Sequence, residues 1–208
     1  MRFAAIRNRQ NWQVQLQLGD SLADIAGGLY AYPPDYMTQL GTFTQEAAGG
    51  RTLSYYATNI AAILAADAGD VWTNAGINDV VLYGKSAAQM LTDLETIRDA
   101  VVADGREFMP FQLTPFKDGI SSNWTSAYQA VVDAYNAALP NWCLTRGHHC
   151  GLVYDAMEDP AAADEMRAAH KFNAGTDDLH YSVAGAQHVA RIWDAGIMAA
   201  RRRIKVAA

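Results

Sequence analysis

Four short segments of the chain contain residue types that could hydrolyse an ester together. Ser21 lies two residues beyond the alternating stretch "QVQLQL", and His180 lies far downstream with Asp177 three positions before it. A serine hydroxyl is a weak nucleophile unless a base takes its proton, and a histidine held by a carboxylate is a suitable base. We therefore predict that Ser21 is the nucleophile, His180 the general base and Asp177 the carboxylate that orients it.

The tetrahedral intermediate of such a reaction also needs hydrogen-bond donors for its oxyanion. The candidates are the backbone N–H of Ser21, the backbone N–H of Gly50 and the side-chain amide of Asn78. A glycine suits this role because no Cβ blocks the approach of a substrate, and Gly49 is the alternative donor at the same place. Purely structural roles compete with these: Ser21 as a helix N-cap, and Asn78 as the side chain of an Asx turn.

The hydrophobic pattern predicts the elements that must position these residues. Strand-like runs alternate with amphipathic stretches typical of helices, and Pro140 is expected to end one of these helices. The predicted strands cover 13–18, 40–45, 70–79 with its exit loop, 106–116 and 151–157, and the predicted helices cover 54–69, 86–105, 124–139 and 182–203. Such alternation predicts βαβ units and a parallel sheet, which binds ligands at the carboxyl ends of its strands. We expect one three-layer α/β domain with about five strands.

The composition limits the classes of function. The 208 residues are half hydrophobic and carry a formal net charge of −6. An acidic surface argues against nucleic acid as the main partner, and no apolar run reaches the ~20 residues that a membrane-spanning helix needs. The basic run at 200–205 is interpreted as the end of a helix. Residues 1–12 lack the long apolar core of a signal peptide and are interpreted as a leader or a boundary segment. The oligomeric state is left open.

Two cysteines, Cys143 and Cys150, lie close together around His148 and His149. They could form a disulfide, which would fit an oxidising compartment, or they could be two free thiols. A metal site is the third alternative, although zinc sites usually show tighter, repeated ligand spacings. An extracellular or periplasmic location, or a place in a larger exported protein, is favoured.

Aromatic residues gather in two of the predicted loops. Tyr30 and Tyr32 come after the candidate nucleophile, and Phe116 and Trp124 flank a later loop. They could form a wall that binds the sugar or aryl group of a substrate. Packing in the core or within the loops is the alternative, and it is the one that the pattern favours.

The four polar segments resemble the conserved blocks of a known enzyme family. "GDSLAD" at 19–24, "GGRT" at 49–52, "GIND" at 76–79 and "DDLHYS" at 177–182 look like the blocks of the SGNH or GDSL hydrolases, in family order and over almost the whole chain. The resemblance implies a flavodoxin-like α/β/α sandwich with five parallel strands, ester hydrolysis, and no metal or organic cofactor.

Carried over by position, the resemblance implies Ser21 as nucleophile, His180 as base, Asp177 as the third triad member, and Gly50 and Asn78 as oxyanion donors. Two departures affect these assignments. Asp178 replaces a glycine that the family often has in its last block, and "QEAAGGRT" lacks the usual Asn-x-Gly of the second block. The first makes Asp178 a rival to Asp177, and the second leaves the choice between the two glycines open.

The expected function is that of a serine esterase acting through an acyl-enzyme on a small-molecule or glycan ester. Short acyl groups are favoured, such as O-acetyl groups on carbohydrates, because the loops lack a long apolar stretch for a fatty chain. An acylhydrolase of the lysophospholipase or thioesterase type is the enzymatic alternative. A non-catalytic carbohydrate-binding module of a larger surface or phage-tail protein is the alternative from another class.

Overall fold

A parallel β-sheet forms the middle layer of the protein. The computed structural model describes residues 14–24, 30–38, 41–117, 124–173 and 177–206. Its central sheet has four strands in the order β2-β1-β3-β4, all parallel. The strands are β1 (Val14–Gly19), β2 (Thr42–Ala47), β3 (Asp70–Thr73) and β4 (Phe108–Pro110).

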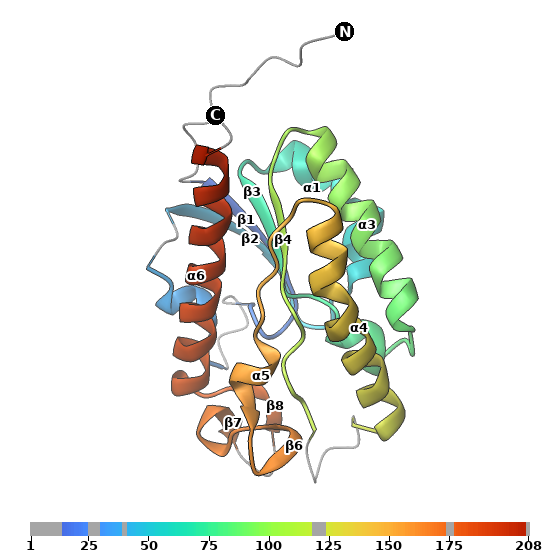
Figure 1. Ribbon diagram of the computed structural model, residues 1–208, viewed down its shortest axis with the longest axis vertical. Coiled ribbons are helices and arrows are strands. Elements are labelled where there is room, and N and C mark those ends of the chain that lie inside the picture. The colour runs from blue at the N-terminus through green and yellow to red at the C-terminus, as the bar shows by residue number, and fades with distance from the viewer. Residues whose placement is uncertain (1–13, 25–29, 39–40, 118–123, 174–176, 207–208) are drawn as a thin grey trace, which may run out of the picture.

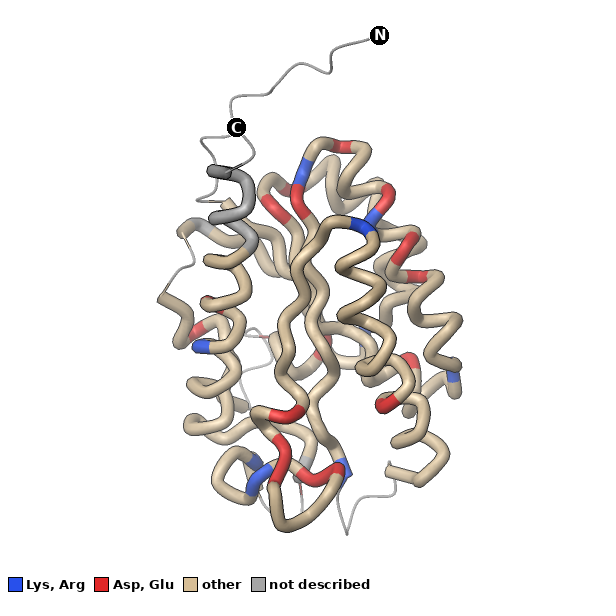
Figure 2. Tube along the Cα trace, in the orientation of Figure 1, with Lys and Arg blue, Asp and Glu red and all other residues tan. Residues whose placement is uncertain are grey.

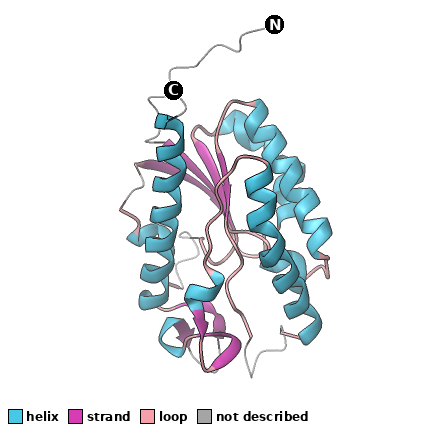
Figure 3. Ribbon diagram, viewed as in Figure 1, coloured by secondary structure: helices cyan, strands magenta, loops and turns pink. Residues whose placement is uncertain are grey.

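Helices cover both faces of this sheet, as Figures 1 and 3 show. The long C-terminal helix α6 packs with the short 3-10 helix η2 on one face, and α1, α3 and α4 pack side by side on the other. The bounds are η2 (Pro33–Tyr36), α1 (Leu53–Ala66), α2 (Ile77–Val81), α3 (Ala87–Ala103), α4 (Ser126–Thr145) and α6 (Val183–Val206). The predicted three-layer α/β class is therefore confirmed.

The central position of β1 explains why its alternating pattern does not separate a buried face from an exposed one. Leu16 and Leu18 are fully buried, but Gln15 and Gln17 on the opposite face are only 3% and 0% exposed. Helices on both faces of a parallel sheet bury both sets of side chains. Gln17 accepts a hydrogen bond from Gln45 Nε2 at 2.8 Å, so a polar contact joins β1 to β2 inside the protein.

The helices begin where the sequence supplies capping side chains. Ser86 caps α3 and forms a capping box with Gln89, whose side chain and backbone both take part. Thr52 accepts the backbone N–H of Tyr55 at the start of α1. At the start of α4, the side chain of Thr125 accepts the backbone N–H of Tyr128. These caps satisfy N–H groups that the first turn of a helix leaves free.

Pro140 does not end α4, and that prediction was wrong. The helix runs through it to Thr145. A proline inside a helix has no N–H for the carbonyl four residues earlier. That carbonyl belongs to Asn136, and it accepts a hydrogen bond from Gln112 Nε2 at 3.2 Å instead. A side chain from the end of β4 thus replaces the missing backbone donor.

The strand predicted at 151–157 is also wrong in most of its length. Only Gly151 pairs with the sheet, in an isolated parallel bridge to Phe111, and Tyr154–Met157 form the short helix α5. Gln112 contributes to the absence of a strand here. Its Oε1 accepts the backbone N–H of Tyr154 at 3.2 Å, so this N–H is not paired with the β-sheet.

Two small hairpins connect α5 to α6, and the sequence pattern did not predict them. They are β5 (Glu158–Asp159) with β6 (Ala162–Met166), and β7 (Lys171–Asn173) with β8 (Asp177–Tyr181), separated by the 3-10 helix η3 (Ala168–His170). The second hairpin carries the predicted base and its carboxylate.

Candidate active site

The predicted serine, histidine and aspartate lie in one chain of close polar contacts. Ser21 Oγ is 2.9 Å from Nε2 of His180. The other ring nitrogen, Nδ1, is 3.0 Å from Oδ1 and 2.9 Å from Oδ2 of Asp177. These distances and this order are what proton transfer from a serine to an aspartate-oriented histidine requires.

A tight turn after β1 presents Ser21 at the carboxyl edge of the sheet. The Ala23 N–H donates to the Asp20 carbonyl at 3.0 Å, and the Leu22 N–H donates to Asp20 Oδ1 at 3.0 Å. Residues 25–29, which follow this turn, lie outside the described part. Asp20 is fully buried. Burial raises its pKa to about 7, and repulsion from Asp79 adds to that effect, against the hydrogen bond from Leu22.

The β8 strand brings the carboxylate and the histidine together within three residues. Asp177 Oδ1 also accepts the backbone N–H of His180 at 3.1 Å, so the aspartate holds both the ring and the main chain of the histidine. The side chain of Asp178, the rival carboxylate, lies outside the described part. Next to the histidine, Tyr181 is buried, and its hydroxyl lies 3.3 Å from Thr114 Oγ1. The active-site end of β8 is thereby anchored in the core.

The segment after β2 reaches both the serine turn and the candidate oxyanion residue Asn78. Asn78 Nδ2 donates to the carbonyl of Arg51 at 3.0 Å. A Cβ built on Gly49 would lie 4.0 Å from the Cβ of Ser21. Gly49 therefore lies beside Ser21, and Arg51, two residues further along the same segment, contacts Asn78.

The two adjacent glycines differ in their backbone geometry. The Gly49 N–H donates to Asp24 Oδ2 at 3.3 Å. Gly50 has a φ of +79°, a conformation that favours glycine, and a Cβ added there would meet no atom within 4 Å. Of the two alternatives, Gly50 has the open surroundings that a substrate would need.

Asp79, to which the sequence assigned no chemistry, fixes the loop that carries Asn78. Its buried carboxylate accepts the Leu53 N–H at 2.7 Å and the Ser54 N–H at 3.4 Å, at the start of α1. Burial raises the pKa of Asp79, and these two hydrogen bonds and Lys85 oppose the rise. The carboxylate thus ties α2 to α1 beside the candidate oxyanion donors.

The four aromatic residues predicted as a substrate wall differ in burial and in their contacts. Tyr32 and Phe116 are buried, at 4% and 3% exposure, and Phe116 belongs to the main hydrophobic core cluster. Trp124 is half-buried and donates its Nε1–H to Gln129 Oε1 at 3.0 Å. Tyr30 instead stacks on the ring of His180. Packing in the core or within the loops, the alternative for these residues, therefore describes Tyr32 and Phe116.

Cys143 and Cys150 are free thiols in the structure. A hydrogen bond to Cys150 raises the pKa of the Cys143 thiol, and burial adds to that effect. The neighbouring His148 donates its backbone N–H to the Cys143 carbonyl at 2.9 Å and places its ring edge-on to Phe108. Within the described ranges, no group of three or more His, Cys, Asp or Glu side chains is arranged to hold a metal ion.

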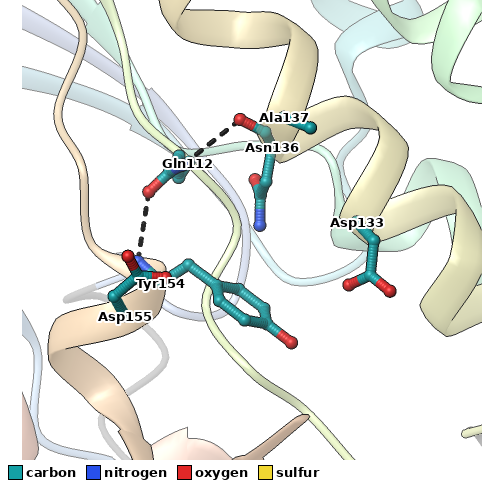
Figure 4. Close-up of a pocket in the computed structure, with 6 residues that line it drawn as sticks. All are labelled: Gln112, Asp133, Asn136, Ala137, Tyr154 and Asp155. Atoms are coloured by element: carbon teal, nitrogen blue, oxygen red, sulfur yellow. Dashed lines mark hydrogen bonds between the residues drawn. The ribbon is translucent and has the colours of Figure 1, made fainter.

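A separate cavity of about 230 Å³ lies between α4 and α5 (Figure 4). Gln112 crosses one side of it and joins Asn136 to Tyr154 through the two hydrogen bonds described above. Acidic residues are concentrated around α5 and β6 (Figure 2). The lining residues are Gln112, Asp133, Asn136, Ala137, Tyr154 and Asp155. None of the triad residues is among them, so this cavity is distinct from the Ser21 site.

Comparison with solved structures identifies the fold. Neither a protein-family model nor a curated protein sequence matches the chain. Its fold matches that of the SGNH and GDSL hydrolases, and the expected resemblance is confirmed at this level.

Three structures illustrate the match. A GDSL-like lipase from Bacteroides thetaiotaomicron is 14% identical, with a TM-score of 0.69 over 95% of this chain and 90% of that one. The native aryl esterase of M. smegmatis is 12% identical, with a TM-score of 0.69 over 90% and 99%. A family 3 carbohydrate esterase of Clostridium thermocellum is 17% identical, with a TM-score of 0.67 over 92% of this chain and 98% of that one. Separately, none of the described helices has the length and apolar character needed to cross a membrane.

Proposed function

We propose that the protein is a serine esterase that hydrolyses carboxylic esters through an acyl-enzyme on Ser21. The observation that carries this proposal is the unbroken chain of contacts from Asp177 through His180 to Ser21, with 2.9 Å between Nε2 and Oγ. A structural N-cap or an ordinary loop histidine would not need this alignment. The names of the structural neighbours, which include an aryl esterase and a carbohydrate esterase, support the same class of reaction.

In the acylation step, Ser21 Oγ attacks the ester carbonyl carbon while His180 Nε2 takes the hydroxyl proton. Asp177 stabilises the imidazolium that forms, since its carboxylate contacts Nδ1. The carbonyl oxygen becomes an oxyanion, for which the N–H groups of Ser21 and Gly50 and the amide of Asn78 are the proposed donors. The C–O bond then breaks, and His180 gives its proton to the departing alcohol.

Deacylation repeats these roles with water as the nucleophile. His180 takes a proton from water as the oxygen attacks the acyl carbon, and it returns that proton to Ser21 Oγ as the acid leaves. We assign Gly50 rather than Gly49 to the oxyanion because the Gly49 N–H is engaged by Asp24. Asn78 Nδ2 uses one of its two N–H bonds on Arg51, which leaves the second for a substrate oxygen.

The proposed substrates are esters with short acyl groups, such as O-acetyl groups on carbohydrates or on small aryl alcohols. The carbohydrate esterase among the structural neighbours supports the first alcohol type and the aryl esterase the second. A series of p-nitrophenyl esters of increasing chain length tests the acyl preference. A maximum at two to four carbons is expected, and a maximum at eight or more would favour the acylhydrolase alternative.

Covalent labelling tests the mechanism itself. A fluorophosphonate probe should label the wild-type protein and not Ser21→Ala, because only an activated serine attacks the phosphorus. Ser126→Ala is the matched control, since Ser126 is an exposed residue at the start of α4. A wild-type protein that is folded but unreactive would overturn the proposal and favour a carbohydrate-binding module.

A further inference from the structure

Tyr30 is held in a face-to-face stack on the proposed catalytic histidine. The ring centroids of Tyr30 and His180 are 3.7 Å apart, and the two planes differ by only 2°. Phe172, on β7, contacts the Tyr30 ring edge-on, with centroids 5.0 Å apart and an angle of 89° between planes. The Tyr30 ring is therefore packed between a ring of β8 and a ring of β7.

Further contacts link Tyr30 to the core and to the triad carboxylate. Its backbone N–H donates to the hydroxyl of Tyr32 at 3.3 Å, and the Tyr32 side chain is almost completely buried. The pKa of the Tyr30 hydroxyl is raised by partial burial, by the charges of Asp177 and Tyr32, and by a side-chain hydrogen bond to Asp177. Tyr30 thus touches both members of the pair that must activate Ser21.

The triad contacts restrict one rotation of the imidazole less than the others. Nδ1 contacts Asp177 on one side of the ring, and Nε2 contacts Ser21 on the other. These two contacts fix the line that runs through the ring from Asp177 to Ser21. They restrict the tilt of the ring about that line much less. A parallel aromatic ring at 3.7 Å restricts this tilt because it occupies one face of the imidazole.

We propose, resting on the esterase function above, that Tyr30 is a positioning residue that braces the face of His180 and thereby aligns Nε2 with Ser21. The brace acts most strongly when His180 is charged, because the face of an aromatic ring attracts a cation. The imidazolium forms in the transition states of both steps rather than in the ground state. Tyr30 should therefore affect kcat more than KM.

The experiment compares Tyr30→Phe and Tyr30→Leu with the wild type, using p-nitrophenyl acetate for kcat and KM and a fluorophosphonate for the rate of labelling. The phenylalanine variant keeps the ring and loses only the hydroxyl, whereas the leucine variant loses the ring. Tyr83→Leu is the matched control, because Tyr83 is 68% exposed between α2 and α3. Thermal unfolding shows whether each variant is folded at the assay temperature.

For Tyr30→Leu we expect a fall of about tenfold in kcat and in the labelling rate, with KM within about twofold of the wild type. Tyr30→Phe should stay within about threefold, and Tyr83→Leu should match the wild type. A raised KM with unchanged kcat in Tyr30→Leu would overturn the proposal and indicate a substrate-binding ring instead. An equal loss in Tyr30→Phe would overturn it as well, because the hydroxyl would then be responsible.

Proton NMR tests the stack independently of activity. The carbon-bound ring protons of His180 lie over the face of Tyr30, so their signals should be shifted upfield in the wild type and in Tyr30→Phe, and not in Tyr30→Leu. Signals that are the same in all three proteins would overturn the proposal even in an active esterase. The wild type could also show the stack by NMR and yet neither hydrolyse esters nor react with the fluorophosphonate. That result would overturn the esterase function, and with it the role of Tyr30.

Discussion

Replacing Asp20 with asparagine should change how the stability of the protein depends on pH. Asp20 is fully buried next to the proposed nucleophile Ser21, and its Oδ1 accepts the Leu22 N–H, a contact that an asparagine oxygen can keep. Its Oδ2 is buried and has no hydrogen-bond partner among the residues that the structure describes. A carboxylate charge at this position is poorly solvated, which is why burial raises the pKa to about 7 from 3.8.

Proton linkage gives the direction in which the folding stability changes with pH. Between pH 4 and pH 7 the folded protein holds the Asp20 proton, whereas the unfolded chain has already released it. The folded state therefore loses stability, relative to the unfolded state, as the pH rises through this window. At roughly 1.4 kcal/mol for each pH unit, the window from 3.8 to about 7 corresponds to on the order of 4 kcal/mol. Asparagine carries no charge, so this contribution is absent from the variant.

The assay is urea unfolding of both proteins at pH 4, 5, 6, 7 and 8. We expect the wild type to lose several kcal/mol relative to Asp20→Asn across this range, with most of the change between pH 4 and pH 7. Carboxylates that do not interact with Asp20 titrate in both proteins and cancel in the difference, whereas Asp79, which repels the Asp20 charge, contributes to it. Asp35→Asn, at an exposed position in η2, is the matched control and should show a much smaller change. A difference between wild type and Asp20→Asn that is constant with pH, or that grows in favour of the wild type, would refute the reasoning.

Three further substitutions test individual contacts. Asn78→Ala should lower kcat by about 10²- to 10³-fold with a smaller change in KM, measured on p-nitrophenyl acetate; an unchanged kcat would remove Asn78 from the oxyanion site. Gly50→Ala should cost about 1 kcal/mol in urea unfolding, because alanine is strained at a φ of +79°, and no loss would contradict that backbone geometry. Gln112→Leu should cost about 1–3 kcal/mol, since the Asn136 carbonyl and the Tyr154 N–H both lose their partner. Stability equal to the wild type would argue against that bridge.

The parts of the fold that could be predicted depend on local patterns. The helix predicted over 86–105 begins at Ala87, directly after the capping residue Ser86, whose capping-box partner Gln89 lies only three positions later. Pro140 shows the limit of such reasoning. Its effect on the helix depends on whether another donor can reach the carbonyl of Asn136, and the donor is Gln112, 24 residues earlier. A pattern of neighbouring residues cannot show that contact.

In the candidate site, too, a contact between residues close in sequence was predictable, and the stack between two distant residues was not. Asp177 and His180 are three residues apart within β8, so their contact involves only a short stretch of chain, and the sequence suffices to predict it. The stack of Tyr30 on His180 joins residues from two distant loops, and the same aromatic residue would suit a substrate wall equally well.

The two kinds of contact also explain why the sequence predicts the reacting groups better than it predicts their surroundings. In the proposed mechanism, Ser21, His180 and Asp177 must be particular residue types, because each supplies a specific atom to the reaction. A residue that braces His180 only has to present a flat face at the right distance, and several side chains could do so. The identity of such a residue therefore depends on the space that the neighbouring loops leave. Here that space lies between Phe172 and His180, and it exists only in the folded chain.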